Sequence, residues 1–250
     1  MNKLIPKIIF ISAALIIIVS SCNEKNANDE SLTVNEYIKA GLPDPARQWQ
    51  TNDYALAFAV LENVKATRPH YLPRKDSEKS GEIFVRILGR DDMRFLNNNA
   101  MSNDEKVLIC RELLKVCERT INLYTISSSG QEYYHRELTD AYLFGLEMTD
   151  AMIDLKNQTE IIRGYDNTDP IQSVYLSGLF NLLRTQNSAS DFAADDHEMM
   201  INSIRNSVEK NKFWFNDNIK ADLRAAFQQI SDSTKAQGYN ANYLDFLGSI

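Results

Sequence analysis

An apolar ladder with alternating spacings of three and four residues most constrains how this 250-residue chain folds. The ladder follows Ser102-Asn103-Asp104-Glu105, in which the serine hydroxyl can cap first-turn amides while the glutamate reaches back. Since this spacing places side chains on one face of a 3.6-residue turn, residues 102–124 are predicted to form an amphipathic helix. The apolar positions of the ladder are Val107, Cys110, Leu114, Cys117, Ile121 and Tyr124.

The same spacing recurs along most of the chain, which contains only 9 glycines and 6 prolines. We expect Asp169 to cap a helix that begins at Pro170, and Ser190 to begin another. Residues 80–88 suit a helix, but their β-branched content also allows a strand. The sequence therefore predicts an all-α fold, an irregular bundle of about seven or eight antiparallel helices in one large domain. Further helices are expected over residues 52–66, 133–155, 170–183, 190–208 and 219–230.

Two features predict how the central helices pair. Residues 127–130, Ser-Ser-Ser-Gly, form a short turn, so the helices before and after it are expected to make an antiparallel hairpin. The second of these helices has Gly145 in the middle of its apolar face, where a neighbouring helix can approach closely. The apolar face of the helix after Pro170 is predicted to include Ile171, Val174, Gly178, Leu179, Leu182 and Leu183.

The first residues of the chain have the pattern of an export segment. Lys3 and Lys7 precede an apolar run of about twelve residues, shorter than the roughly 20 that a membrane-spanning helix needs. The run ends in Val19-Ser20-Ser21-Cys22, which resembles the lipobox of bacterial lipoproteins. The resemblance implies cleavage before Cys22, lipidation of the Cys22 thiol with diacylglycerol and acylation of its new amino group. An uncleaved anchor helix or an ordinary secretory signal is the alternative.

This resemblance divides the chain into three parts: a signal peptide over residues 1–21, an acidic tether over 22–31 and a helical domain over 32–250. The tether contains no large apolar side chain, so it is expected to stay flexible. Lipidated Cys22 would hold the domain at the outer membrane of a Gram-negative envelope. The tether loosely resembles surface-export signals, and exposure to the periplasm or to the cell surface stays open.

Charge narrows the range of partners. Without the two signal-peptide lysines, 25 basic residues face 34 acidic residues, a net charge of −9. The sequence contains no dense Lys/Arg cluster, which argues against a nucleic-acid partner and against adhesion to anionic lipid.

The two cysteines of the domain are predicted to be free. Cys110 and Cys117 are separated by about 10 Å of helical rise, whereas a disulfide needs Cα atoms within about 7 Å. We expect both to be buried as small apolar side chains. A metal or redox pair is the alternative, but the Cys-x-x-Cys spacing and a nearby histidine are both missing.

Histidines offer few metal sites, since the chain has only His70, His135 and His197. Glu132 and His135 have the Glu-x-x-His spacing of di-iron bundles, but the motif occurs once instead of twice. Asp195-Asp196-His197-Glu198 is the densest ligand cluster, although four successive helical residues cannot converge on one ion. His197 shares a stripe with Ile201 and Ile204, so it is expected to be half buried. No metal or cofactor site is therefore assigned.

Enzymatic motifs are also missing: the sequence has no Gly-rich phosphate loop, no Gly-x-Ser-x-Gly elbow and no His-Glu-x-x-His. A polysaccharide hydrolase or lyase would need two carboxylates about 5–10 Å apart. Asp150 with Asp154, or Asp191 with Asp195, fits that requirement on one helix. Solvated helix faces explain the same residues, so no catalytic residue is assigned.

Aromatic residues concentrate in Lys212-Phe213-Trp214-Phe215, in Tyr133-Tyr134 and near the C-terminus. Core packing explains them, and an anchor for a partner or a platform for sugar rings is the alternative. Asp232-Ser233-Thr234 resembles a short O-glycosylation signal, although a helix end followed by a polar turn gives the same residues. The C-terminal aromatic residues are Tyr239, Tyr243 and Phe246.

These observations favour an envelope lipoprotein that binds a protein or glycan partner through its helical domain. An immunity or inhibitor protein is one form of this hypothesis, because an acidic surface suits a basic toxin or hydrolase. A polysaccharide-acting enzyme and a structural component of an envelope complex are the alternatives.

Overall fold

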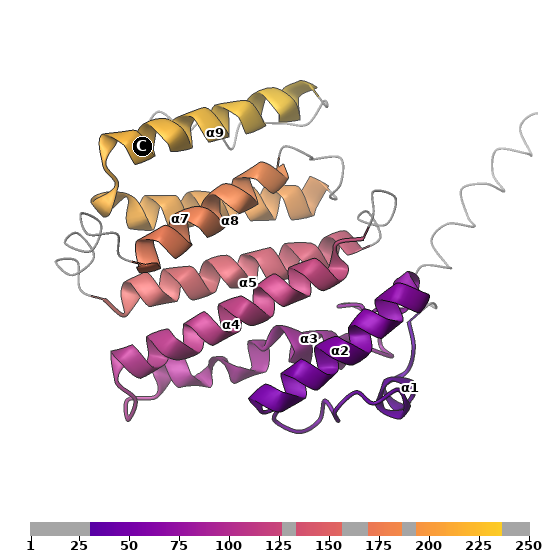
Figure 1. Cartoon of the computed structure of the whole chain (residues 1–250). Helices are drawn as coiled ribbons and strands as arrows, with labels where there is room; N and C mark the ends of the chain where they lie inside the picture. Colours follow the sequence, from indigo (N-terminus) through magenta and orange to yellow (C-terminus); the bar gives the residue numbers. More distant parts are fainter. Residues whose placement is uncertain (1–30, 127–133, 157–169, 187–193, 237–250) are drawn as a thin grey trace, which may run out of the picture.

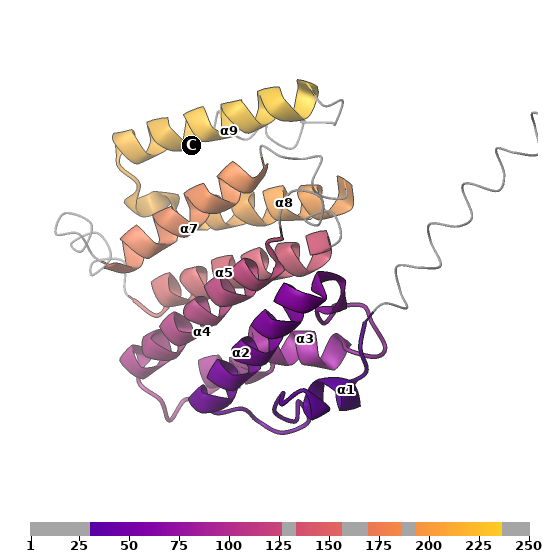
Figure 2. The ribbon, with the colours of Figure 1, turned by 45° about the vertical axis from the view of Figure 1, so that its right-hand side comes forward.

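The computed structural model describes residues 31–126, 134–156, 170–186 and 194–236. Across these ranges the chain forms α-helices and short 3-10 helices without any β-strand, which confirms the all-α prediction. The helices stack as an irregular bundle (Figure 1, and turned by 45° in Figure 2). None of the described helices is long and apolar enough to cross a membrane.

The helices of the N-terminal half are α1 (Val34–Lys39), α2 (Thr51–Thr67), α3 (Gly81–Leu88) and α4 (Asn103–Tyr124), with 3-10 segments η1 (Pro69–Tyr71) and η2 (Arg90–Asn97). Those of the C-terminal half are α5 (His135–Asp154), α7 (Pro170–Gln186), α8 (Ala194–Asn211), η5 (Lys212–Trp214) and α9 (Asp217–Ala236). Residues 81–88 are therefore helical rather than a strand. Helix α7 begins at Pro170, whereas its expected cap Asp169, Ser190 and the turn over 127–130 lie outside the described residues.

Helix α4 has the predicted capping box. The Glu105 amide donates to Ser102 Oγ at 3.3 Å, and the Ser102 amide donates to Glu105 Oε2 at 2.8 Å. The apolar ladder of α4 is only partly buried, however. Cys110 and Tyr124 are fully buried, whereas Leu114 and Ile121 are half buried because they face a groove described below.

Helices α4 and α5 form the centre of the bundle and run antiparallel (Figure 1). Helices α2 and α3 pack on α4, α7 and α8 pack on α5, and α9 packs on α7. At Gly145 of α5, a Cβ atom would lie 3.9 Å from Cys117 Cβ and 4.0 Å from Leu114 Cδ2. The approach of α4 expected at Gly145 is thus present, at ordinary van der Waals distance.

Three buried tyrosines hold the connector between α2 and α3, and we call them the tyrosine clamp. Tyr37 of α1, Tyr124 at the end of α4 and Tyr134 before α5 each donate a hydroxyl hydrogen bond to a backbone carbonyl of this connector. The acceptors are the carbonyls of Tyr71, Pro73 and Pro69 respectively. Tyr134 also accepts a hydrogen bond from the Leu72 amide at 3.2 Å. The rings of Tyr124 and Tyr134 meet edge-on, with centroids 5.1 Å apart.

Carboxylates of α5 bind the end of the same connector. Glu137 is 2% exposed, and its Oε1 accepts from the Lys75 amide at 2.7 Å, while its Oε2 has no hydrogen-bond partner among the described residues. Asp140 pairs with Lys75 Nζ at 3.3 Å and with Arg90 Nη2 at 3.0 Å. Arg90 also lies over the ring of Phe144, 4.7 Å from its centroid. These contacts fix the N-terminal half against α5.

The tyrosine clamp predicts the effect of removing one hydroxyl. Tyr124→Phe leaves the Pro73 carbonyl without its buried donor, so the free energy of unfolding should fall by about 1–3 kcal/mol. Urea unfolding at 25 °C measures this difference. Tyr142→Phe is the matched control, because no described residue hydrogen-bonds the Tyr142 hydroxyl, and it should change stability by less than about 0.5 kcal/mol. Equal losses in the two variants would contradict the clamp.

Glu137 predicts a dependence of stability on pH. Burial raises the pKa of Glu137 above 4.5, opposed by the hydrogen bond from Lys75 and by the charges of Arg74 and His135. The folded state therefore holds the proton of the Glu137 carboxyl more tightly than the unfolded chain does. The stabilisation from protonated Glu137 is complete below pH 4.5 and is lost as pH rises through the raised pKa.

Glu137→Gln should therefore reduce the loss of unfolding free energy as pH rises from about 4 to 7. Urea unfolding at a series of pH values measures it. Glu62→Gln on the exposed side of α2 is the control. The assignment fails if both variants keep the pH profile of the unmodified protein.

Candidate functional site

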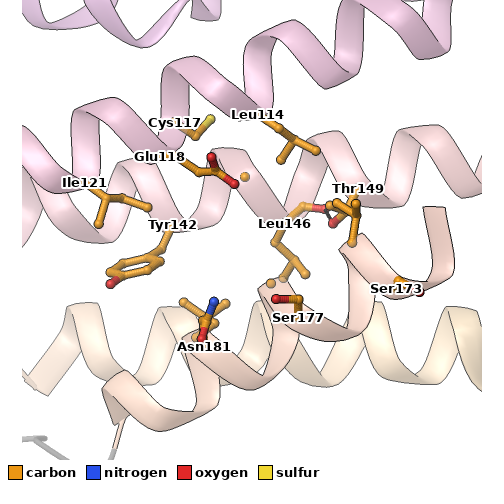
Figure 3. A pocket seen from close by; sticks show the side chains of 14 residues that line it. Leu114, Cys117, Glu118, Ile121, Tyr142, Leu146, Thr149, Ser173, Ser177 and Asn181 are labelled. Carbon is orange, nitrogen blue, oxygen red and sulfur yellow. Dashed lines mark hydrogen bonds between the residues drawn. The ribbon is translucent and has the colours of Figure 1, made fainter. Parts of the chain in front are cut away.

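A groove lies between α4 and α7, and α5 forms its floor (Figure 3). Its volume is about 330 Å³, at the lower end of the range for ligand-binding pockets. Leu146 and the half-buried Ile121 contribute apolar surface to the floor and to the α4 wall. Thr149 donates its hydroxyl to the Leu146 carbonyl at 2.8 Å, so that hydroxyl is already satisfied within α5. The groove is therefore mainly apolar at its base.

Helix α7 contributes a wall of small side chains. Ser173, Ser177 and Gly178 are exposed there, and Val174 is 38% exposed. A Cβ atom on Gly178 would find no other atom within 4 Å. The prediction that Val174 and Gly178 belong to the buried face of α7 is therefore wrong. Tyr175, which the pattern missed, is fully buried in their place.

Polar groups stand at the mouth of the groove. Of the described lining residues, only Glu118 is charged, and its carboxylate makes no ion pair with any described residue. Figure 3 shows Glu118 projecting from α4 toward the α7 side, where Ser177 and Asn181 lie, with Tyr142 of α5 beside them. An apolar base with a few polar groups at the rim is the usual composition of a binding site.

The candidate carboxylates Asp150 and Asp154 do not line the groove. Asp150 Oδ1 accepts hydrogen bonds from Ser207 Oγ at 2.7 Å and from Asn211 Nδ2 at 2.8 Å, and Ser207 Oγ lies 3.0 Å from the Tyr175 hydroxyl. Burial raises the pKa of Asp150, against the lowering effect of these hydrogen bonds. Asp154 pairs with Lys210 of α8. This polar network joins α5, α7 and α8.

The second acidic pair is only partly described, since Asp191 lies outside the described residues and Asp195 is exposed at the start of α8. The histidines are likewise dispersed. His70 is exposed in η1, Glu132 lies outside the described residues, and His197 is 2% exposed on the inner face of α8. His135 Nε2 lies 3.1 Å from Asp196 Oδ2, an ion-pair distance that links α5 to α8.

No group of three or more histidine, cysteine, aspartate or glutamate side chains suited to a metal ion occurs among the residues that the structure describes. Cys110 and Cys117 are both buried and free, which confirms that they do not pair. Burial raises the pKa of Cys110 to about 11 and that of Cys117 to about 12. Since the thiolate is the reactive form, both thiols are poor nucleophiles at neutral pH.

The aromatic cluster after α8 is divided between core and surface. Trp214 and Phe215 are 5% and 7% exposed, and Trp214 packs edge-on against Tyr175 at 5.6 Å. Phe213 is 42% exposed. Tyr134 is fully buried in the tyrosine clamp, whereas Tyr133 and the C-terminal Tyr239, Tyr243 and Phe246 lie outside the described residues.

The expected helix end before the short glycosylation-like motif is wrong. Helix α9 continues to Ala236, so residues 232–234 lie inside the helix. The Asp232 carboxylate accepts a hydrogen bond from Gln228 Nε2 at 2.9 Å on the preceding turn.

The groove itself was not predicted from the sequence. Its apolar positions, Leu114, Ile121, Gly145, Val174 and Gly178, all belong to ladders that predict burial. An apolar stripe looks the same whether a neighbouring helix covers it or leaves it open. The small residues at 173, 177 and 178 on one face of α7 were the sequence signal from which an open groove could have been predicted.

Comparison of the chain with protein-family models, with curated proteins and with solved structures gave no match.

Proposed function

We propose that this protein is a lipid-anchored lipoprotein of the Gram-negative outer membrane that acts by binding a protein partner in the groove. The observation that carries the proposal is the groove itself, where the described residues leave apolar positions of three helical ladders uncovered. Apolar surface that a fold leaves accessible in a concave site is typical of a binding function.

The lining of the groove favours a protein over a glycan. Sugar rings bind well on flat aromatic faces, and Tyr142 is the only aromatic residue among those that line the groove. Aliphatic and small side chains form the rest of the base, which suits aliphatic side chains of a partner. The hydrolase alternative has less support, because Asp150 and Asp154 already bind Ser207, Asn211 and Lys210.

The anchor is proposed from the lipobox resemblance of residues 19–22. A single acyl chain binds a membrane only marginally, whereas the three chains that this resemblance implies would hold the domain stably. Cys22→Ala should abolish incorporation of labelled palmitate and prevent normal processing of the precursor. Gel mobility and membrane fractionation of the labelled protein measure both effects. Unchanged labelling and membrane recovery would contradict lipidation at Cys22.

The binding proposal is tested by filling the groove. Gly178→Phe projects a ring into the open space beside Gly178, so it should reduce capture of the partner at least tenfold. Leu56→Phe is the matched control, because it places a ring at a position of α2 that is 49% exposed and does not line the groove. Both variants should keep the far-UV circular dichroism of the parent.

Crosslinking in living cells at low ionic strength, followed by affinity purification, compares the partner recovered by the parent and by both variants. A partner retained by Leu56→Phe and lost by Gly178→Phe supports the groove as the binding site. Equal recovery by all three proteins would show that binding occurs elsewhere.

A further inference from the structure

The groove has the dimensions and charge of a site for one helix, an inference that rests on the proposed function. We propose that the groove binds an amphipathic α-helix of the partner, with its apolar stripe on the α5 floor and a Lys or Arg beside Glu118.

The length of the groove matches two to three helical turns. Leu114 and Ile121 are separated by about 10 Å of rise on α4, and Ser173 and Leu182 by about 14 Å on α7. Apolar anchors at positions i, i+3 or i+4, and i+7 of an inserted helix cover about 10 Å. A single short helix lying along the groove therefore places its three anchors within the lined region.

Small wall side chains allow a helix to approach closely. The separation of packed helices depends on side-chain size at the contact, and α7 presents Ser173, Ser177 and Gly178 there. Gly178 lies in the interior of α7, where a glycine costs about 0.5–1 kcal/mol relative to alanine. No described atom within 4 Å of its absent Cβ explains that cost within the isolated chain. An approaching helix does explain it.

Charge specifies a basic partner. The Glu118 carboxylate is the only charge among the described lining residues, and the α7 wall carries none. The mature chain, with 25 basic and 34 acidic residues, also attracts a basic partner at long range. A rim charge of this kind selects partners and speeds association more than it adds affinity.

Other occupants fit these observations less well. The chain's own residues 237–250 contain Asp245 and no Lys or Arg, so they would bring a second carboxylate toward Glu118. A second copy of the chain carries the same negative net charge. An alkyl chain would keep much of its surface in water, because Val174 is 38% exposed and Ser177 is exposed along the open side.

The test selects peptides from a phage-displayed library of random 16-residue sequences, with the full-length lipoprotein in lipid nanodiscs as the target. Empty nanodiscs and nanodiscs carrying Gly178→Phe remove sequences that do not need the groove. A parallel selection uses Glu118→Lys, which changes an exposed side chain. Leu56→Phe on the exposed side of α2 serves as the folded control with an open groove.

Peptides enriched by the parent should have apolar residues at i, i+3 or i+4, and i+7 with flanking Lys or Arg. The Glu118→Lys selection should shift the flanking residues to Asp or Glu. A synthetic peptide from the first selection should bind Glu118→Lys about twofold to fivefold more weakly, as for an exposed charge pair, and Gly178→Phe at least tenfold more weakly.

Enrichment without helical spacing, a charge preference unchanged by Glu118→Lys, or no groove-dependent enrichment would overturn the amphipathic-helix proposal. Displacement of the peptide from the parent protein by an added peptide of residues 237–250 would identify the chain's own C-terminal segment as the occupant and would overturn the proposal as well. If the cellular partner still depends on Gly178 in any of these cases, the proposed function stands and only the partner class is wrong. If neither the peptide selection nor the capture of the cellular partner depends on Gly178, the groove is rejected as a binding site.

Discussion

The tyrosine clamp is the contact on which the arrangement of the other helices depends. The connector between α2 and α3 buries Leu72 and Pro73, and a buried backbone carbonyl without a donor costs about 1–3 kcal/mol. Tyr37, Tyr124 and Tyr134 supply those donors from three different helical regions. Because Tyr124 ends α4 and Tyr134 precedes α5, the same bonds fix the end of α4 and the beginning of α5. These hydrogen bonds therefore hold the N-terminal helices in a fixed position against α4 and α5.

The groove is a consequence of that arrangement. Helix α4 uses its two faces for α2, α3 and α5, while α5 packs against α4, α7 and α8. Helix α7 is held at a distance from α4 by its contacts with α5 and by the polar network of Asp150, Ser207 and Tyr175. The apolar residues at the boundary, among them Leu114 and Ile121, are then only half buried and line the groove. Their exposure follows from packing elsewhere in the bundle.

Local patterns predicted much of the fold, and long-range contacts explain what they missed. The capping box at Ser102, the start of α7 at Pro170 and the free thiol of Cys110 depend on a few neighbouring residues, so the sequence predicts them. The hydroxyl of Tyr124 reaches a carbonyl 51 residues away, and no spacing rule identifies such a partner. Similarly, Tyr175 rather than Val174 is buried because Ser207 and Trp214 contact it from later segments.

Two glycines differ in whether the fold itself requires them. Gly89 has φ +78°, and a Cβ there would lie 2.7 Å from Leu113 Cδ2, so the fold itself requires glycine between α3 and η2. Gly178 has ordinary helical conformation and open space around its absent Cβ, so folding would favour alanine at this position. A residue that costs stability and lies in an apolar groove is best explained by a contact made outside the chain. That contact is the one we assign to the partner helix.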